Sequence, residues 1–447
     1  METTTTTEKL RHPKGLYLIS FVTLWERFSF YGLSAFLIYY MTNDPNAINQ
    51  LGGLGIKEDI ASIIISTFMG LCYLLSLPGG RIADRYFGKR KSILIGGFLI
   101  TAGLLSLASD LGPYTFYGGL AFICFGNGFF KPSASSLVGD LYEQGDKRKD
   151  AAYTIFYMVF NGGAFAAPIL CGYLNNWGYK FGFLAIAIGM IVGMIVYVFA
   201  AQKFLGDAGK TPIAKPKKDE VVVKQPLTKE EKQRISVIFI VILFVTFFWM
   251  GFSQTASSLA LYTRDFIDRS IFNWEVPAEW FQSVNPLLIL FLGAPFSALW
   301  IFLAKRKKDP SIPVKMGLGM IILGAGFLFM VGAVIQRGGD NTDPTAKASL
   351  IFLIMTYLFH TIGELCVSPI GLSMISKLAP QRMTTFFMGT WFLSIFLAYF
   401  IGGFMVSFIN SFGAFSIFSG IAIFVAALGV IVLLISKRLV TMMHGIK

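Results

Sequence analysis

The chain has 447 residues, of which 55% are hydrophobic, 15% aromatic and only 14% charged. Soluble domains carry about 25% charged residues, so this composition excludes a soluble globular protein and predicts a polytopic membrane protein. The formal net charge of +13 does not indicate a nucleic-acid partner, because the basic residues lie in short loops between apolar segments.

Twelve apolar segments are long enough to cross a bilayer as helices at about 1.5 Å per residue. They lie near residues 15–42, 57–80, 92–109, 113–141, 151–174, 180–204, 235–262, 283–304, 313–336, 348–377, 383–410 and 413–436. Connections after even-numbered segments carry the basic clusters, which places both termini in the cytoplasm. We therefore expect a multi-pass protein of the cell (inner) membrane, in contact with the lipid bilayer.

The longest polar connection, 206–234, separates two regions, 1–205 and 235–447, that hold six segments each. Its Lys, Pro and Glu residues predict a flexible or amphipathic cytoplasmic linker. The linker sequence Gly209-Lys210-Thr211 looks like the end of a phosphate-binding loop, but Phe204 occupies the position of the opening glycine and no strand precedes it. Any transport must therefore be driven by an ion gradient or by the substrate's own gradient.

The four cysteines all fall in apolar segments and show no metal-ligand spacing. They are Cys72, Cys124, Cys171 and Cys366. We expect neither a metal nor a cofactor.

The first segment carries two charges, Glu26 and Arg27, well inside the expected hydrocarbon layer. Each costs roughly 2.5 to 3.5 kcal/mol on insertion scales, so both should have partners. Ionisable groups at this depth mark transport pathways and proton relays. The alternative is an ion pair that only fixes helix packing.

Two further charges lie in segments that correspond in the two halves. Lys131 precedes Pro132 in the fourth segment, and Glu364 lies a little ahead of Pro369 in the tenth. Paired proline-interrupted helices indicate a transporter binding site, and a cation opposite an anion suits a zwitterion. Alternatively, the two groups pair with each other. His360, one turn before Glu364, is either a proton relay or a packing residue.

The loop from Gly79 to Lys91 contains Asp84 and Arg85 and resembles the G-x-x-x-D-R-x-G-[RK] loop of the major facilitator superfamily. The resemblance implies a cytoplasmic latch that holds helix ends together in one transport state and releases them in the other. Ordinary positive-inside loop chemistry is the alternative reading.

Four further motifs together resemble the proton-dependent oligopeptide transporter family. They are Glu26-Arg27-Phe28-Ser29-Phe30-Tyr31-Gly32, the run Phe130 to Tyr142 followed by Asp150 to Met158 and Asn161, Glu364-Leu365 with Ser368 to Ser373, and Trp391-Phe392-Leu393. The resemblance covers nearly the whole chain. It implies an all-α major facilitator fold, with twelve transmembrane helices in two six-helix bundles around a midplane cavity.

The same resemblance implies a transporter, not an enzyme, that takes up di- and tripeptides by proton symport through alternating access. Glu364 is expected to hold the substrate's amino group, and Lys131 to belong to the proton and carboxylate machinery near Glu26 and Arg27. Weaker substrate-binding candidates are Tyr31, Tyr157, Asn161, Gln254 and Trp391, for each of which interhelical packing is the alternative. We expect a monomer.

Four positions depart from the family pattern. Thr23 replaces the first Glu of E-x-x-E-R, Ser34 an Arg, Ser253 a helix 7 Glu, and Phe68 a pocket Tyr. Because the Arg and the helix 7 Glu are both replaced, no buried charge is left without its partner. We therefore hypothesise that coupling survives through Glu26 with Lys131. The alternative function is a same-fold facilitator or symporter for another small amphoteric or anionic solute.

Overall fold

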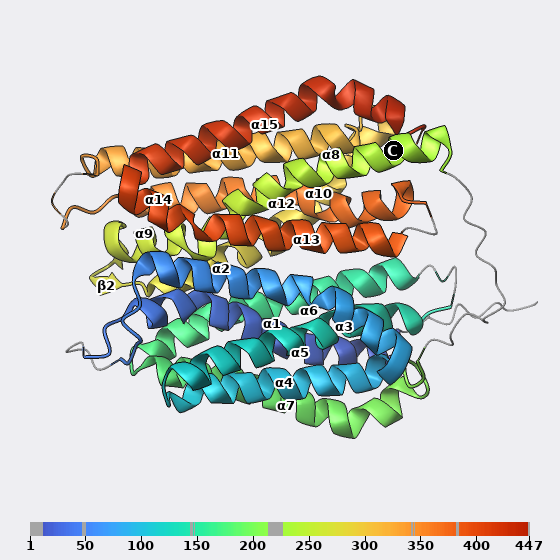
Figure 1. The fold of residues 1–447 in the computed structure, drawn as a ribbon, viewed down its shortest axis with the longest axis horizontal. Coiled ribbons are helices and arrows are strands. Elements are labelled where there is room, and N and C mark those ends of the chain that lie inside the picture. Colours follow the sequence, from blue (N-terminus) through green and yellow to red (C-terminus); the bar gives the residue numbers. More distant parts are fainter. Residues whose placement is uncertain are drawn as a thin grey trace, which may run out of the picture.

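The computed structural model describes residues 12–46, 51–143, 146, 148–212, 227–340, 343, 345–380 and 384–445. Nearly all of the described chain is helical, and the long helices run roughly alongside one another (Figure 1). This agrees with the expectation of an all-α membrane protein.

The helices of the first half are α1 Lys14–Thr42, α2 Glu58–Leu74, α3 Ser76–Ile82, α4 Lys89–Ser109, α5 Pro113–Asp140, α6 Arg148–Asn175 and α7 Tyr179–Leu205. A short π-helix, η1 Ala83–Phe87, joins α3 to α4. Gly88 ends it with φ 75°, a left-handed conformation that glycine adopts without strain.

The helices of the second half are α8 Lys229–Phe252, α9 Ser258–Phe266, α10 Val284–Lys305, α11 Ile312–Gln336, α12 Leu350–Leu378, α13 Thr384–Gly403, α14 Met405–Phe412 and α15 Ala414–Met442. Two 3-10 turns, η2 Ser253–Ala256 and η3 Ala278–Ser283, precede α9 and α10. The half begins with a capping box, in which Thr228 Oγ1 accepts from the Glu231 backbone and Glu231 Oε2 accepts from the Thr228 backbone.

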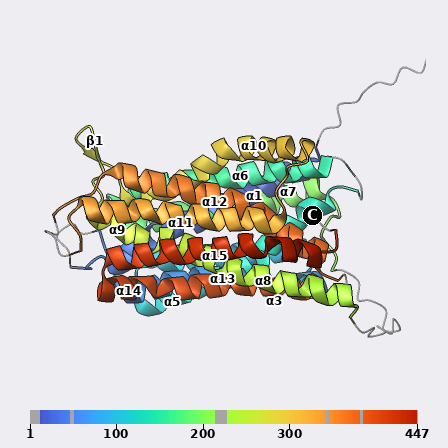
Figure 2. The ribbon, with the colours of Figure 1, turned by 90° about the horizontal axis from the view of Figure 1, so that it is seen from above.

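Some features differ from the sequence expectation. Three expected segments are each divided into two helices: 57–80 between α2 and α3, 235–262 by η2 between α8 and α9, and 383–410 between α13 and α14. Each still forms one candidate membrane span. A small antiparallel hairpin, β1 Ser270–Ile271 with β2 Trp274–Glu275, lies between α9 and η3 and projects from the helices in Figure 2. Phe272 and Asn273, at its tip, both have positive φ.

Ten helical segments of the described residues are long and apolar enough to cross a membrane. The long helices α1 and α5 are not among the ten, and these two carry the intramembrane charges noted above, Glu26 with Arg27 and Lys131. The structure therefore supports a multi-pass membrane protein.

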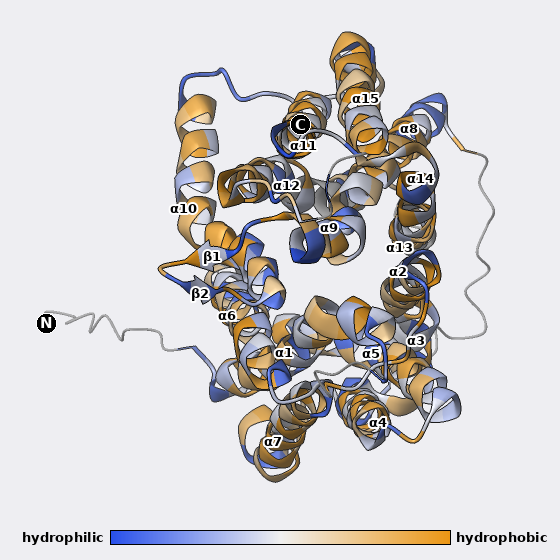
Figure 3. Ribbon diagram, turned by 90° about the vertical axis from the view of Figure 1, so that its left-hand side faces the viewer, coloured by the Kyte–Doolittle hydropathy of each residue, from blue (hydrophilic) through white to orange (hydrophobic). Residues whose placement is uncertain are grey.

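Helices α1 to α7 and α8 to α15 form two groups that face each other, as Figure 3 shows in a view along the helices. The groups meet where α2 packs on α13 and where α6 packs on η3 and α10. We call the end holding Thr42, Asn175 and α9 the α9 end, and the opposite end, with Leu205 and Lys229, the linker end. Helix α9 lies over the middle of the assembly at its own end (Figure 3).

Glycine pairs bring helices within the first half into close contact. A Cβ on Gly126 of α5 would lie 2.7 Å from the carbonyl oxygen of Gly96 on α4, and one on Gly119 would lie 2.8 Å from that of Gly103. Small residues at such crossings allow the backbones to approach closely, which is the main way that membrane helices gain packing energy.

We predict that Gly126→Ala destabilises the folded protein by about 1 to 3 kcal/mol, because its methyl group overlaps α4 backbone atoms. Gly118→Ala, on the same helix, is the matched control because nothing lies within 4 Å of its Cβ position. It should be neutral or stabilising, since alanine favours helix by about 1 kcal/mol. Thermal stability in detergent, measured by size-exclusion chromatography after heating, compares the two. Equal stability of both variants would contradict the packing argument.

Candidate functional site

A cavity of about 340 Å³ lies between the two halves. This volume falls within the ~300–1,000 Å³ typical of small-molecule sites. Its walls come from α1, α2 and α6 of the first half and from α8, η2, η3, α10, α12 and α13 of the second. They are formed by Arg27, Phe30, Tyr31, Ser34, Met69, Tyr73, Tyr157, Phe160, Asn161, Trp249, Phe252, Thr255, Ala256, Gln282, Asn285, Pro286, Ile289, Tyr357, Glu364, Ser368, Trp391, Phe392, Ile395 and Tyr399.

Three charges on the first-half side form one cluster, made of Glu26, Arg27 and Lys131. Glu26 is 1% exposed, and its Oε2 lies 3.3 Å from Arg27 Nε while its Oε1 lies 3.8 Å from Lys131 Nζ. None of these contacts has hydrogen-bond geometry among the described residues. One anion faces two cations, so the cluster carries a surplus positive unit when all three groups are ionised.

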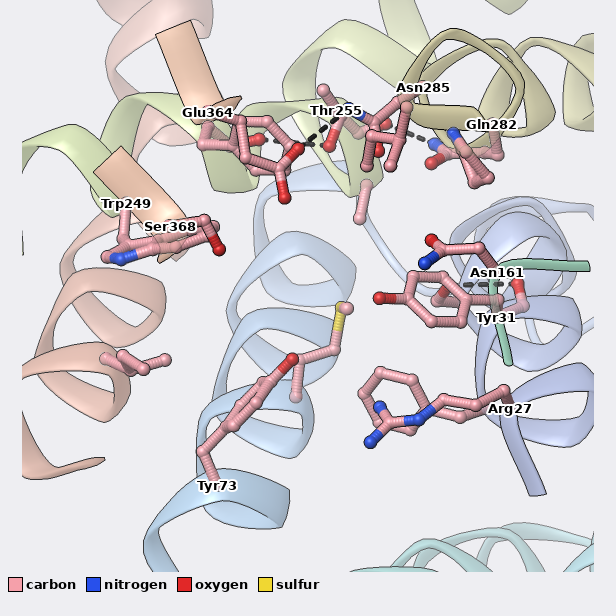
Figure 4. A pocket seen from close by; sticks show the side chains of 18 of the residues that line it. Arg27, Tyr31, Tyr73, Asn161, Trp249, Thr255, Gln282, Asn285, Glu364 and Ser368 are labelled. Carbon is pink, nitrogen blue, oxygen red and sulfur yellow. Dashed lines mark hydrogen bonds between the residues drawn. The ribbon is translucent and has the colours of Figure 1, made fainter. Parts of the chain in front are cut away.

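Lys131 is held behind an aromatic wall. Its Nζ lies 3.6 Å from the centroid of the Phe30 ring and 5.1 Å from that of Tyr73, distances at which a cation interacts favourably with a π face. Phe30 and Tyr73 line the cavity, whereas Glu26 and Lys131 do not. Arg27 lines the cavity directly (Figure 4), so it connects the buried cluster to the space where a ligand can sit.

The anion of the second half, Glu364, faces the same cavity from α12 (Figure 4). Its Oε2 accepts a hydrogen bond of 2.9 Å from Asn285 Nδ2, and that amide also donates to Thr361 Oγ1 at 3.0 Å. No cation lies within 4.0 Å of the Glu364 carboxyl among the residues that the structure describes. Lys131 is paired with Glu26 instead, so Lys131 and Glu364 are not each other's partners in this conformation.

Four of the five weaker candidates lie in the cavity wall. Tyr31, Tyr157, Asn161 and Trp391 all line it, and Asn161 Nδ2 donates to the Tyr157 carbonyl oxygen at 2.9 Å. Their hydroxyl, amide and aromatic groups come from three helices, α1, α6 and α13.

Gln254 is the exception, because its side chain does not line the cavity. Its side chain is fully buried behind the wall. The amide Nε2 donates to the carbonyl oxygens of Met250 and Gly402, at 3.0 and 3.1 Å, and Oε1 accepts from Ser258 Oγ at 2.7 Å. Gln254 therefore joins η2 to α13 and satisfies the helix break, and it has no free group to offer a substrate.

The positions that depart from the family pattern are occupied by small or apolar groups. Ser34 lines the cavity, and its hydroxyl donates to the Tyr31 carbonyl oxygen at 2.9 Å. Ser253 is buried and donates to the Met250 carbonyl oxygen. Phe68 is buried outside the cavity wall, and the tyrosine that α2 supplies to the wall is Tyr73.

His360 lies beside the site without sharing its hydrogen bonds. Both ring nitrogens are buried and have no hydrogen-bond partner among the described residues. The ring packs against Phe327, at 4.7 Å between centroids, and against Phe252 at 6.3 Å. This environment favours the packing interpretation over the relay.

The loop at the linker end places Asp84 and Arg85 in η1. Neither makes an ion pair with a described residue, although Arg85 lies over the Tyr86 ring. The ion pair that joins helices here is Lys89 Nζ with Asp140 Oδ2, at 2.6 Å, between α4 and α5. A latch role for Asp84 and Arg85 therefore stays a prediction.

The halves are joined by hydrogen bonds at the α9 end. Arg264 of α9 binds Glu58 Oε1 at 2.7 Å and Thr42 Oγ1 at 2.8 Å, both from the first half. Asn175 of α6 donates to Glu279 of η3 at 3.1 Å. These hydrogen bonds between the halves hold the α9 end closed in this conformation.

Several wall residues were not singled out from sequence. Gln282 lies in η3, and Asn285 and Pro286 lie in the first turn of α10. A pair of amides beside a proline in an apolar segment was a signal that could have found them. Tyr73 and Tyr399 stack across the two halves, with 6.1 Å between their centroids. No sequence pattern distinguishes these tyrosines from others in apolar segments, because the pairing exists only in the tertiary structure.

Comparisons with known proteins agree on one family. The sequence model of the POT family matches residues 90–215 and 210–422. The chain is 33% identical over 458 residues to the peptide transporter YePEPT of Yersinia enterocolitica, covering 88% of each chain. It is 32% identical over 483 residues to the uncharacterized transporter YclF of Bacillus subtilis, covering 97% of this chain and 96% of the relative.

Solved structures give the same result. The crystal structure of a peptide transporter POT in complex with sulfate superposes with a TM-score of 0.90 at 32% identity, covering 97% of this chain and 96% of that one. A POT family transporter in complex with 5-aminolevulinic acid superposes with a TM-score of 0.87 at 30% identity, covering 96% and 97%.

We predict that Gln254→Leu lowers stability by about 1 to 3 kcal/mol, because it leaves the Gly402 carbonyl and the Ser258 hydroxyl without their partner. Ligand affinity of the folded fraction should stay within about twofold of the parent, since Gln254 lies outside the wall. Asn161→Leu, in the wall, is the comparison variant and should weaken binding more than it lowers stability. Thermal unfolding and equilibrium binding on the same preparations test both statements, and a selective loss of affinity in Gln254→Leu would return this residue to the site.

Proposed function

The chain belongs to the POT family, and from this premise we propose that it takes up di- and tripeptides by proton symport through alternating access. It is a transporter rather than an enzyme. The observation that carries the proposal is the cavity between the halves, with Arg27 on one wall and Glu364 on the other. A zwitterion placed there has its carboxylate near the surplus positive charge and its ammonium group near the carboxyl of Glu364.

The polar groups of the wall suit the backbone of a short peptide. Tyr31, Tyr157 and Asn161 from the first half and Asn285 from the second supply hydroxyl and amide groups. The remaining wall is largely aromatic and aliphatic, which accommodates side chains without fixing their identity. A site that binds the two charged termini and the backbone of a peptide, and does not fix the identity of its side chains, tolerates many peptide sequences.

Proton coupling is assigned to Glu26, Arg27, Lys131 and Glu364. Glu26 is the only anion that contacts Arg27 and Lys131 among the described residues. Protonation of Glu26 removes the attraction that holds both cations and frees Arg27 for the substrate carboxylate. Peptide binding and proton binding then favour each other, which is the linkage that symport requires.

The architecture proposed for this cycle is a major facilitator fold with twelve membrane-spanning helices, which adds α1 and α5 to the ten apolar segments. Residues 1–205 and 235–447 would form the two bundles and 206–234 the linker. We place the chain in the cell (inner) membrane as a monomer with both termini in the cytoplasm. The α9 end then faces outward, and Asp84 and Arg85 act as the latch at the cytoplasmic end.

We predict that Glu26→Gln abolishes acid-driven accumulation of a labelled dipeptide in proteoliposomes. A pH difference of one unit supports about tenfold accumulation per coupled proton, because each tenfold step corresponds to about 1.4 kcal/mol. The variant should only equilibrate the peptide, while peptide counterflow without a gradient persists. Glu230→Gln, at an exposed site near the start of α8, should behave as the parent. Concentrative uptake by Glu26→Gln would remove Glu26 from the coupling mechanism.

We also predict that blocking the substrate's amino group weakens competition for dipeptide uptake by about ten- to hundredfold. A hydrogen bond to a charged group contributes about 1.5 to 3 kcal/mol. Glu364→Gln should lose most of this discrimination between free and N-acetylated peptides. Uptake of labelled dipeptide in the presence of free peptide, blocked peptide, free amino acids and nitrate measures it. Competition by nitrate or by single amino acids as strong as that by peptides would favour the alternative, a same-fold carrier of other small solutes.

A further inference from the structure

A second buried carboxyl lies at the α9 end, outside the cavity wall. Glu279 of η3 is 8% exposed, at the contact between α6 and η3. Its Oε1 accepts a hydrogen bond of 3.1 Å from Asn175 Nδ2 of α6. The two residues come from opposite halves, so their contact exists only while the α9 end is closed.

No cation neutralises this carboxyl. Among the described residues, none of the ion pairs includes Glu279. Arg269, the cation in electrostatic contact with it, is bound to Glu275 Oε1 and to the Val276 carbonyl oxygen, each at 2.6 Å. The other ionisable groups around it are Tyr39 of α1, Cys171 of α6, Tyr179 of α7 and, one layer further, Arg264 of α9, which is paired with Asp265 and Glu58. α10 continues η3 with Val284, Asn285 and Pro286, none of them ionisable.

The hydrogen bonding of the Asn175 amide indicates that the Glu279 carboxyl carries a proton. Asn175 donates through Nδ2, but its Oδ1 is buried and receives no hydrogen bond from any described residue. An ionised carboxylate can only accept, so it cannot satisfy Oδ1. A protonated Glu279 has an O–H to donate to Oδ1 while its other oxygen accepts from Nδ2. The ionised form has two neutral donors, the Asn175 amide and the Glu279 backbone N–H, and leaves Oδ1 unsatisfied, so burial disfavours it.

We propose that Glu279 and Asn175 form a proton-binding site that latches the α9 end shut. Closure takes one proton from the medium at that end onto the Glu279 carboxylate. Opening separates α6 from η3, hydrates the carboxylate and returns the proton to the same medium. The site therefore responds to external acidity without moving a proton across the membrane, which distinguishes it from the cluster of Glu26, Arg27 and Lys131. The inference rests on the proposed function in one respect, that transport requires this end to open and close.

The test measures closure itself. Spin labels at Lys180→Cys and Ser270→Cys, two exposed sites on opposite halves, report the separation of the halves by double electron–electron resonance in lipid nanodiscs without substrate. The native cysteines are all buried, and the unlabelled parent checks their background. One proton taken up on closing makes the closed-to-open ratio rise by up to about tenfold for each unit by which the pH falls, over the range in which the site titrates.

Glu279→Gln fixes the neutral form and should leave the end closed, with less than about twofold change in the ratio over the same range. Glu279→Asp restores a carboxyl and should restore the pH response. Asp44→Asn, an exposed carboxyl at the same end that does not contact Arg269, should respond as the parent does. A parent that does not respond to pH, or an unchanged response in Glu279→Gln, overturns the proposal, as does loss of the response in Asp44→Asn. Because no substrate is present, failure of peptide uptake counts against the proposed function alone.

Discussion

The rest of the structure depends on how the chain neutralises charge inside a membrane. Glu26 lies between Arg27 on its own helix and Lys131 on α5, and this contact fixes the relation of two helices that the sequence separates by about a hundred residues. Neither cation is stable at this depth without an anion, because an unpaired charge in low dielectric costs several kcal/mol. The single carboxylate therefore faces two cations, and in the proposed cycle its protonation releases both.

The two halves place different charges beside the cavity that lies between them. The first half contributes the surplus positive unit behind Phe30 and Tyr73, and the second contributes Glu364, held by a neutral amide from Asn285. A zwitterionic ligand supplies a charge of opposite sign to the groups of both halves at the same time. This gives the ligand a differential affinity for the conformation that brings the halves together, which is the requirement for a ligand to shift a conformational equilibrium.

Closure at the α9 end uses a different set of groups. Arg264 contacts Glu58 and Thr42 across the halves, and Asn175 contacts Glu279 nearby. Ser34 and Ser253, two of the departures from the expected family pattern, donate locally to the carbonyl oxygens of Tyr31 and Met250 and do not join the halves. The hydrogen bonds between the halves therefore lie further out, next to the hairpin and η3.

The sequence by itself determined the class of protein, the approximate ends of the long helices, and the buried charges on which the proposed function depends. Hydrophobic length and the scarcity of charge leave few alternatives in a bilayer, so Glu26, Arg27, Lys131 and Glu364 could be found by inspection. Only the tertiary structure decided which residues contact one another. It separated Lys131 from Glu364, moved Gln254 out of the wall to support a helix break, stacked Tyr73 on Tyr399, and buried Glu279 against Asn175. These outcomes depend on which face each helix turns toward its neighbours, and an almost uniformly apolar helix has no periodic pattern that encodes that rotation.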